Sequence, residues 1–372
     1  MNTSDISADE LRSVVKLRPE IVALAAYKQG KPADNDAFKL SSNENPFEPI
    51  PEVIAAIVAS CGVNRYPNAS GLELRERLAT RFGVRVEEVH LGAGSVSILA
   101  QLIQAAAGVG DEVLYAWRSF EAYPGLVAVA GATSVTVANT EDERHDLPGM
   151  IAAITDRTRV IIVCSPNNPT GSIVTKTEFA QFMGQVRSDI LVILDEAYIE
   201  FVTDPTAVNG RELAGRYANL VVARTFSKAY GLAGLRIGYA VGAEYILDAA
   251  RTTSIPLSVT EAAQRAALVS LDYETVLLER VARLSVLRDE VWRCLVDQGW
   301  TVARPHGNFV WLATGDGTKQ AVEVFERAGI VVRPLYPDGI RVSIGEAQSV
   351  GALLTASAEL VSYHLKRVVP QG

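Results

Sequence analysis

Residues 220–241 read LVVARTFSKAYGLAGLRIGYAV and hold two predicted strands joined by a chemically unusual turn. The apolar run at 220–223 reads as a buried strand, and residues 236–241 read as a second one. The two runs are too close together for a full crossover helix, so we expect the second strand to run antiparallel to the first. Between them lies Lys228, with Arg236 eight residues further on.

The same alternation of short apolar runs with amphipathic stretches extends back to about residue 85. Such a pattern is typical of βαβ units. Further buried strands are expected at residues 89–91, 112–115, 134–137, 160–163 and 190–194. The sequence therefore predicts an α/β fold with a mostly parallel seven-stranded sheet between helices.

A different pattern follows this region. Helical periodicity dominates residues 260–299 and predicts one long connecting helix or a pair of helices. Beyond it we expect strands at 309–312, 330–332 and 340–344 and helices at about 321–328 and 346–366. We predict three regions: an N-terminal arm (1–30), a large domain (31–260), and the connecting helix with a smaller α+β C-terminal domain (261–372).

Composition narrows the classes of function. A chain of 372 residues that is 48% hydrophobic can bury a large core, while a net charge of -8 and the lack of a basic stripe argue against nucleic acid. The polar start does not resemble a secretory signal, and no apolar run could span a bilayer, so we expect a cytoplasmic protein without a membrane partner. The three cysteines and four histidines show no disulfide or metal-ligand spacing, so no metal is expected.

The neighbours of Lys228 suggest a cofactor. A lysine that attacks a carbonyl needs a lowered pKa, which burial or a cation such as Arg236 can supply. Arg236, Ser227 and Thr225 would also form a cluster of donors for a phosphate dianion. Lysine and phosphate together favour pyridoxal phosphate, although a solvated lysine in a glycine-rich loop is the alternative.

A glycine-rich turn, GAGS at residues 92–95, lies between a predicted strand and a predicted helix. Glycines let the backbone approach a phosphate at a helix N-terminus. The near match to GxGxxG also leaves a nicotinamide dehydrogenase open, although Ser97 replaces the third glycine. A tight turn without a ligand is the remaining alternative.

Two further segments follow predicted strands. Residues 165–171 read SPNNPTG, in which prolines restrict the loop and amides offer donors, as they also would in a simple Asx turn. Residues 195–198 read DEAY and offer Asp195 to a pyridine nitrogen and Tyr198 to a ring oxygen. An NTPase would need GxxxxGK[ST], which the chain lacks, whereas an aspartate that only caps a turn stays open.

Arg341 lies in GIRVSIG at residues 339–345. The period-two alternation of a strand places it and Ser343 on the face opposite the apolar residues. A bidentate arginine would suit the carboxylate of an amino acid, and a solvated strand face is the alternative.

In their order and spacing these motifs resemble the fold-type I pyridoxal-phosphate aminotransferases, and among them the histidinol-phosphate aminotransferase family. The resemblance runs from LSSNENP at residues 40–46 to residue 344. It implies that Lys228 forms the Schiff base with the cofactor and moves a proton between the substrate Cα and C4′. It implies that Asp195 pairs with the pyridine nitrogen. The other cofactor residues that it implies are Tyr198 and Asn168 at the ring oxygen, Phe120 against the ring, and Ala93, Gly94, Ser95, Thr225, Ser227 and Arg236 at the phosphate.

The resemblance also implies partners. It assigns Asn43, Tyr27 and Arg341 to the substrate. It implies a homodimer in which Tyr66 reaches the cofactor phosphate of the neighbouring subunit.

The substrate question depends on residues 115–124, which read YAWRSFEAYP. Histidinol-phosphate enzymes commonly carry Pro-Ser/Thr-Tyr/Phe before the stacking aromatic, and this chain does not. WRSFE, together with RTFSK at 224–228, is similar to the branch of aromatic amino acid or phenylalanine aminotransferases. We therefore expect transfer of an amino group between an aromatic amino acid and a 2-oxo acid such as 2-oxoglutarate. The alternatives are histidinol-phosphate transamination and a β-lyase, and Trp117 is either a core residue or a substrate contact.

Overall fold

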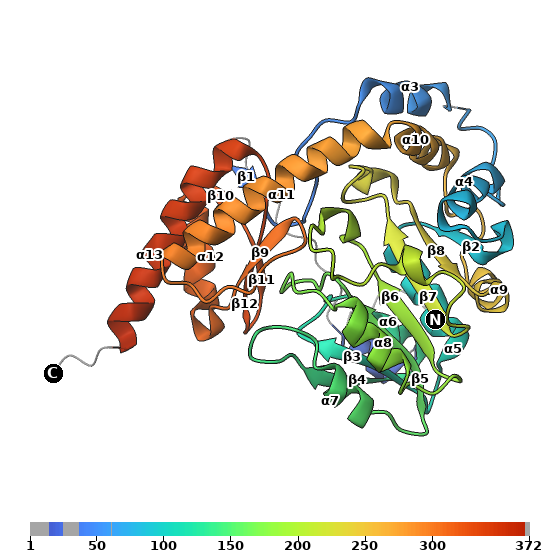
Figure 1. The fold of residues 1–372 in the computed structure, drawn as a ribbon, viewed down its shortest axis with the longest axis horizontal. Helices are drawn as coiled ribbons and strands as arrows, with labels where there is room; N and C mark the ends of the chain where they lie inside the picture. The colour runs from blue at the N-terminus through green and yellow to red at the C-terminus, as the bar shows by residue number, and fades with distance from the viewer. Residues whose placement is uncertain (1–14, 25–36, 61, 369–372) are drawn as a thin grey trace, which may run out of the picture.

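The fold is organised around one large twisted sheet (Figure 1). The structure is a computed structural model that describes residues 15–24, 37–60 and 62–368. The sheet has seven strands in the order β2-β8-β7-β6-β5-β3-β4. Their bounds are β2 Val89–Gly92, β3 Glu112–Trp117, β4 Thr133–Ala138, β5 Thr158–Cys164, β6 Leu191–Asp195, β7 Leu220–Thr225 and β8 Gly238–Gly242. The strand β8 runs antiparallel to the other six, so the predicted mostly parallel sheet and its antiparallel seventh strand are confirmed.

Helices cover both faces of this sheet because its strands alternate apolar side chains between them. On β6, for example, Ile193 packs into one apolar cluster while Val192 and Leu194 pack into another. The first cluster includes residues of α5 (Ser95–Ala106), α6 (Tyr123–Ala130) and α9 (Glu244–Thr252). The second includes residues of α7 (Leu147–Ala152) and α8 (Lys176–Met183).

A smaller sheet lies beside the large one, in the orange and red part of the chain (Figure 1). The strands β9 (Phe309–Leu312), β11 (Arg333–Leu335) and β12 (Gly339–Ser343) form it in the order β11-β12-β9. Two helices, α12 (Thr318–Arg327) and α13 (Val350–Val368), belong to the same part of the chain. The predicted strands and helices are present here, but β11 was not predicted because it is short and contains Pro334, a residue that does not fit a central strand.

The remaining elements connect or flank these sheets. The helical region predicted at 260–299 is a pair, α10 (Glu261–Asp272) and α11 (Glu274–Asp297), and α11 runs between the two parts of the molecule (Figure 1). The two-residue strands β1 (Phe38–Lys39) and β10 (Ile330–Val331) pair in parallel, which ties residues 38–39 to the C-terminal part. The other α-helices among the described residues are α2 (Pro19–Val22), α3 (Pro51–Ala59) and α4 (Leu72–Phe82).

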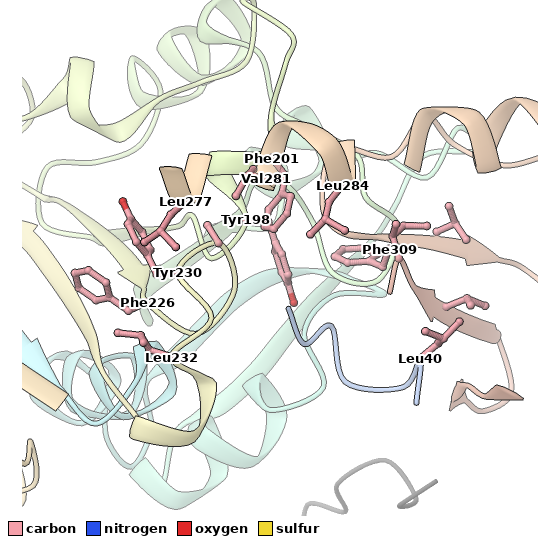
Figure 2. Close-up of a cluster of buried hydrophobic side chains, with 14 of the residues drawn as sticks. Leu40, Tyr198, Phe201, Phe226, Tyr230, Leu232, Leu277, Val281, Leu284 and Phe309 are labelled. Atoms are coloured by element: carbon pink, nitrogen blue, oxygen red, sulfur yellow. The ribbon is translucent and has the colours of Figure 1, made fainter. Parts of the chain in front are cut away.

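An apolar cluster under α11 supports the turns that follow β6 and β7 (Figure 2). Leu277 and Val281 of α11 belong to this cluster with Tyr198, which follows β6, and Phe226, which follows β7. The rings of Tyr198 and Phe309 meet edge to face with centroids 5.0 Å apart. Burial of each such side chain contributes about 1.5–3 kcal/mol, so the cluster holds both turns firmly.

In the part of the chain that the structure describes, no helix is both long and apolar enough to cross a membrane.

Candidate active site

Three adjacent parallel strands, β5, β6 and β7, end at one edge of the large sheet. The SPNNPTG loop follows β5, Asp195 is the last residue of β6, and Lys228 lies in the turn after β7. The carboxyl ends of parallel strands are where open α/β sheets bind ligands. Three of the predicted segments therefore meet because the strands before them are neighbours.

Lys228 is partly buried and has an altered pKa. Burial, together with the charges of Arg341 and Arg236, lowers its pKa to about 7, although Glu44 acts in the opposite direction. Its Nζ donates to the backbone oxygen of Ser42 at 3.1 Å. A lysine in this state is largely a neutral amine above pH 7 and can attack a carbonyl group.

Asp195 is almost fully buried, and one of its oxygens is left without a partner. Its Oδ2 accepts a hydrogen bond from the hydroxyl of Tyr123 at 2.7 Å. Its Oδ1 is buried and has no hydrogen-bond partner. Burial raises the pKa of the carboxyl to about 6, and the bond from Tyr123 opposes that rise. A buried oxygen of this kind fits a donor supplied by a bound group, such as a protonated ring nitrogen.

Tyr123 is a functional candidate that the sequence analysis missed. It begins α6, is fully buried, and meets Phe120 edge to face with ring centroids 5.5 Å apart. The available signal was its position three residues after Phe120, because side chains at that spacing can share one face of a helical turn. Phe120 itself is partly buried in the segment that follows β3.

A cluster of donors faces the start of α5. Thr225 Oγ1 donates to Ser227 Oγ at 2.8 Å, and Arg236 Nη1 donates to the same Ser227 oxygen at 3.4 Å. The Arg236 guanidinium lies so close to Gly94 that a Cβ on this glycine would clash with it, and Gly94 has a φ of +82°. Ala93 and Ser95 flank Gly94, and Ser95 is the first residue of the helix. Backbone N–H groups, hydroxyls and a guanidinium at a helix N-terminus are the donors that suit a phosphate.

Arg341 and Ser343 bind the segment around Asn43. Arg341 donates to Asn168 Oδ1 at 2.6 Å and to the backbone oxygen of Ser41 at 2.8 Å. Ser343 Oγ donates to Asn43 Oδ1 at 2.9 Å. Both strand residues are buried, so the solvated strand face considered from sequence is wrong.

Tyr198 completes this group of contacts. Its hydroxyl accepts from Asn43 Nδ2 at 2.9 Å, and Lys228 Nζ lies 5.9 Å from its ring centroid. Burial raises the pKa of Tyr198 to about 12, so its hydroxyl stays protonated at neutral pH. The structure thus links five of the predicted residues by direct contacts and charge: Lys228, Tyr198, Asn43, Arg341 and Asn168.

The structure does not place two of the predicted residues, Tyr66 and Tyr27, at this site. Tyr66 lies between α3 and α4 and its side chain is 85% exposed. Tyr27 lies outside the described residues. Among the described residues no group of three or more His, Cys, Asp or Glu side chains could hold a metal ion.

Comparison with known proteins assigns the chain to a family. The sequence profile of the family described as aminotransferase class I and II matches residues 35–356. The chain belongs to the class I and II aminotransferases. It is therefore an enzyme that exchanges amino groups between amino acids and 2-oxo acids, and the dehydrogenase alternative is wrong.

Relatives of this aminotransferase carry more specific names. It is 49% identical over 338 residues to the aromatic amino acid aminotransferase of Streptomyces avermitilis, an alignment that covers 90% of this chain and 94% of that protein. It is 48% identical to the aromatic amino acid aminotransferase of Streptomyces coelicolor, with 92% and 97% covered.

Solved structures support the fold assignment. The histidinol-phosphate aminotransferase of Sinorhizobium meliloti, in complex with pyridoxal-5'-phosphate, aligns with a TM-score of 0.84 and 26% identity over 95% of this chain and 100% of that one. The aspartate aminotransferase of Thermus thermophilus with maleate aligns with a TM-score of 0.77 and 25% identity over 87% and 92%. The aminotransferase thus has the predicted fold of the type I enzymes.

Proposed function

We propose that this aminotransferase moves an amino group between an aromatic amino acid and a 2-oxo acid such as 2-oxoglutarate, with pyridoxal 5'-phosphate as its cofactor. The observation that carries the proposal is its identity of 48–49% with aromatic amino acid aminotransferases over about nine tenths of the chain. The WRSFE segment agrees with that identity. The histidinol-phosphate aminotransferase is similar at 26% identity, which favours that substrate less.

The cofactor is supported by two features of the site. The buried Oδ1 of Asp195 has no partner and would accept from the pyridine nitrogen. The cradle formed by Gly94 and Arg236 would hold the phosphate, with Thr225, Ser227 and the backbone of Ala93 and Ser95 as further donors. When bound, pyridoxal phosphate supplies an aldehyde that condenses with amines and a ring that accepts the electron pair released at the substrate Cα.

The residues around the ring would orient it. Phe120 would lie against one face, and Asn168 and the protonated hydroxyl of Tyr198 would donate to the ring oxygen. Asp195, held by Tyr123, would keep the ring nitrogen protonated, which strengthens the ring as an electron acceptor. The guanidinium of Arg341 would bind the substrate carboxylate with its planar fork, and Asn43 and Tyr27 would complete that end of the site.

Lys228 would carry the proton. Its Nζ is neutral above about pH 7, so it can accept the proton from the substrate Cα and then release it to C4′ of the cofactor. Lys228→Ala should abolish turnover and the visible absorption of bound cofactor. The matched control is Lys176→Ala, since Lys176 is exposed and forms an ion pair with Glu212. Normal turnover by Lys228→Ala would contradict the assignment.

We also propose that the enzyme is cytoplasmic and that each chain consists of an arm (1–30), a large domain (31–260) and the connecting helix with a small domain (261–372). We propose further that it is a homodimer in which Tyr66 contacts the cofactor phosphate of the neighbouring subunit. The 85% exposure of Tyr66 within one chain supports this role. Mixed dimers of Tyr66→Ala and Lys228→Ala subunits test it, because each mixed dimer regains one intact site only if Tyr66 acts across the interface. No recovery of activity on mixing would contradict it.

The substrate is tested by comparing kcat/KM for phenylalanine, tyrosine and histidinol phosphate with 2-oxoglutarate as the acceptor. We expect both aromatic amino acids to exceed histidinol phosphate. If histidinol phosphate were preferred by more than about 200-fold, the margin would exceed what apolar pocket fit supplies, and the aromatic assignment would be wrong. Release of pyruvate and ammonia from cystathionine, with homocysteine as the leaving group and no 2-oxo acid added, would instead indicate a β-lyase.

A further inference from the structure

The turn between β11 and β12 is held by a side chain that directly follows a strand of the large sheet. Arg118, directly after β3, donates through Nε to Asp338 Oδ2 at 2.7 Å and through Nη2 to the backbone oxygen of Tyr336 at 2.8 Å. Its side chain is only 14% exposed. Its guanidinium also lies over the ring of Trp117, 4.6 Å from the centroid, which favours a fixed orientation. One face of Trp117 is therefore covered by Arg118, so this ring supports the arginine.

The backbone of Arg118 is fixed as well. Its carbonyl oxygen accepts from the side-chain amides of Asn139 at 2.9 Å and Asn167 at 3.0 Å. Asn167 is the neighbour of Asn168, which accepts a hydrogen bond from Arg341. The loop after β5 therefore forms hydrogen bonds with both Arg118 and Arg341.

A second ion pair holds the hairpin through its first strand, β11. Arg333 of β11 donates through Nε to Glu121 Oε2 at 3.1 Å, and its side chain is 11% exposed. Arg333 and Arg341 are direct partners in the antiparallel register, so their side chains share one face of the sheet. Like charges at such positions repel. The carboxylate of Glu121 offsets the charge of Arg333 and so lets Arg341 remain beside it.

We propose that Arg118 and Glu121 are positioning residues that hold the β11–β12 hairpin against the large sheet and so fix Arg341 for the substrate carboxylate. This inference rests on the proposed role of Arg341. It gives the W-R-S-F-E segment a function: Trp117 supports Arg118, Arg118 holds Asp338, and Glu121 neutralises Arg333. The segment thus acts, through Arg341, on the carboxylate that amino acid and 2-oxo acid substrates share.

The test compares holoenzymes that carry Arg118→Met or Arg118→Lys with wild type. We expect Arg118→Met to raise KM about tenfold for phenylalanine and for 2-oxoglutarate, with kcat within a factor of about two and cofactor absorption unchanged. Arg118→Lys keeps the charge but loses the fork, so it should recover only part of the difference. The rate of the half-reaction with phenethylamine, an amine without a carboxylate, should not change, because this half-reaction needs no 2-oxo acid.

The matched control is Arg327→Met. Arg327 forms an ion pair with Glu359 at 2.7 Å within the same C-terminal part, so its loss should leave both KM values unchanged. Unchanged KM values in Arg118→Met, or an equal loss with phenethylamine, would overturn the proposal.

A double-variant cycle separates positioning from an independent effect. If Arg118 acts through Arg341, the fold increase in KM of the Arg118→Met, Arg341→Lys double variant should be well below the product of the fold increases of the two single variants. A double variant whose fold increase in KM equals that product would overturn the proposal. An effect of Arg341→Lys without any effect of Arg118→Met would refute only this inference, whereas no effect of Arg341→Lys on KM would refute the proposed role of Arg341 itself.

Discussion

Replacement of Lys228 by methionine should make the cofactor-free protein more stable at pH 6. Burial is the main cause that lowers the pKa of Lys228 from 10.5 to about 7. The unfolded chain keeps the ordinary pKa, so it binds more protons than the native state between pH 7 and 10.5, and stability rises with pH across that window. Below pH 7 the native state holds an unfavourable ammonium, at a cost of up to about 5 kcal/mol at 1.36 kcal/mol per pKa unit.

Methionine has a similar length and no charge, so Lys228→Met removes this cost without a large cavity. It also removes the bond from Nζ to Ser42, worth about 1 kcal/mol. Because the side chain is only partly buried, solvent screens part of the charge. We therefore expect a net gain of about 2–4 kcal/mol at pH 6 that shrinks to zero or a slight loss near pH 10.

The assay is urea unfolding of both cofactor-free proteins at pH 6, 8 and 10, followed by circular dichroism. Lys176→Met serves as the control, since this exposed lysine should show no gain that depends on pH. If Lys228→Met is no more stable than wild type at pH 6, or if its advantage does not shrink as the pH rises, burial does not lower the pKa of Lys228 as described.

Three further variants test other parts of the site. Arg341→Lys keeps the charge but loses the planar fork, so KM for amino acids should rise at least tenfold while the cofactor stays bound; loss of the cofactor, seen in the visible spectrum, would mean that Arg341 has another role. Tyr123→Phe removes the hydrogen bond that lowers the pKa of Asp195, so that pKa should rise and the acid limb of the pH–kcat profile should move to higher pH; an unmoved limb would argue against this link. Gly94→Ala places a methyl group against Arg236 at a φ of +82°, so equilibrium dialysis should show cofactor affinity reduced at least tenfold, and unchanged affinity would argue against the phosphate cradle.

The sequence predicted those site residues that lie at the carboxyl ends of buried strands. Asn168, Asp195 and Lys228 were predicted to lie near a ligand because each follows or ends a buried strand, and their strands are adjacent in the sheet. The antiparallel β8 was predictable because the link from β7 is too short for a crossover helix.

The sequence could not give contacts between distant segments. The bond between Arg341 and Asn168 depends on how β12 lies against the large sheet, which no local pattern encodes. The pairing of Arg118 with Asp338 has the same origin, and so does the pairing of β1 with β10. No role was predicted for Tyr123, because only the fold brings its hydroxyl to Asp195.

The most direct test of the central claim is a half-reaction of the purified holoenzyme with phenylalanine and no acceptor. We expect one equivalent of phenylpyruvate per active site, a matching loss of the cofactor's aldehyde absorption, and renewed turnover when 2-oxoglutarate is added. Histidinol phosphate should react more slowly under the same conditions. Failure of both phenylalanine and tyrosine to form any 2-oxo acid, while histidinol phosphate reacts fully, would contradict it.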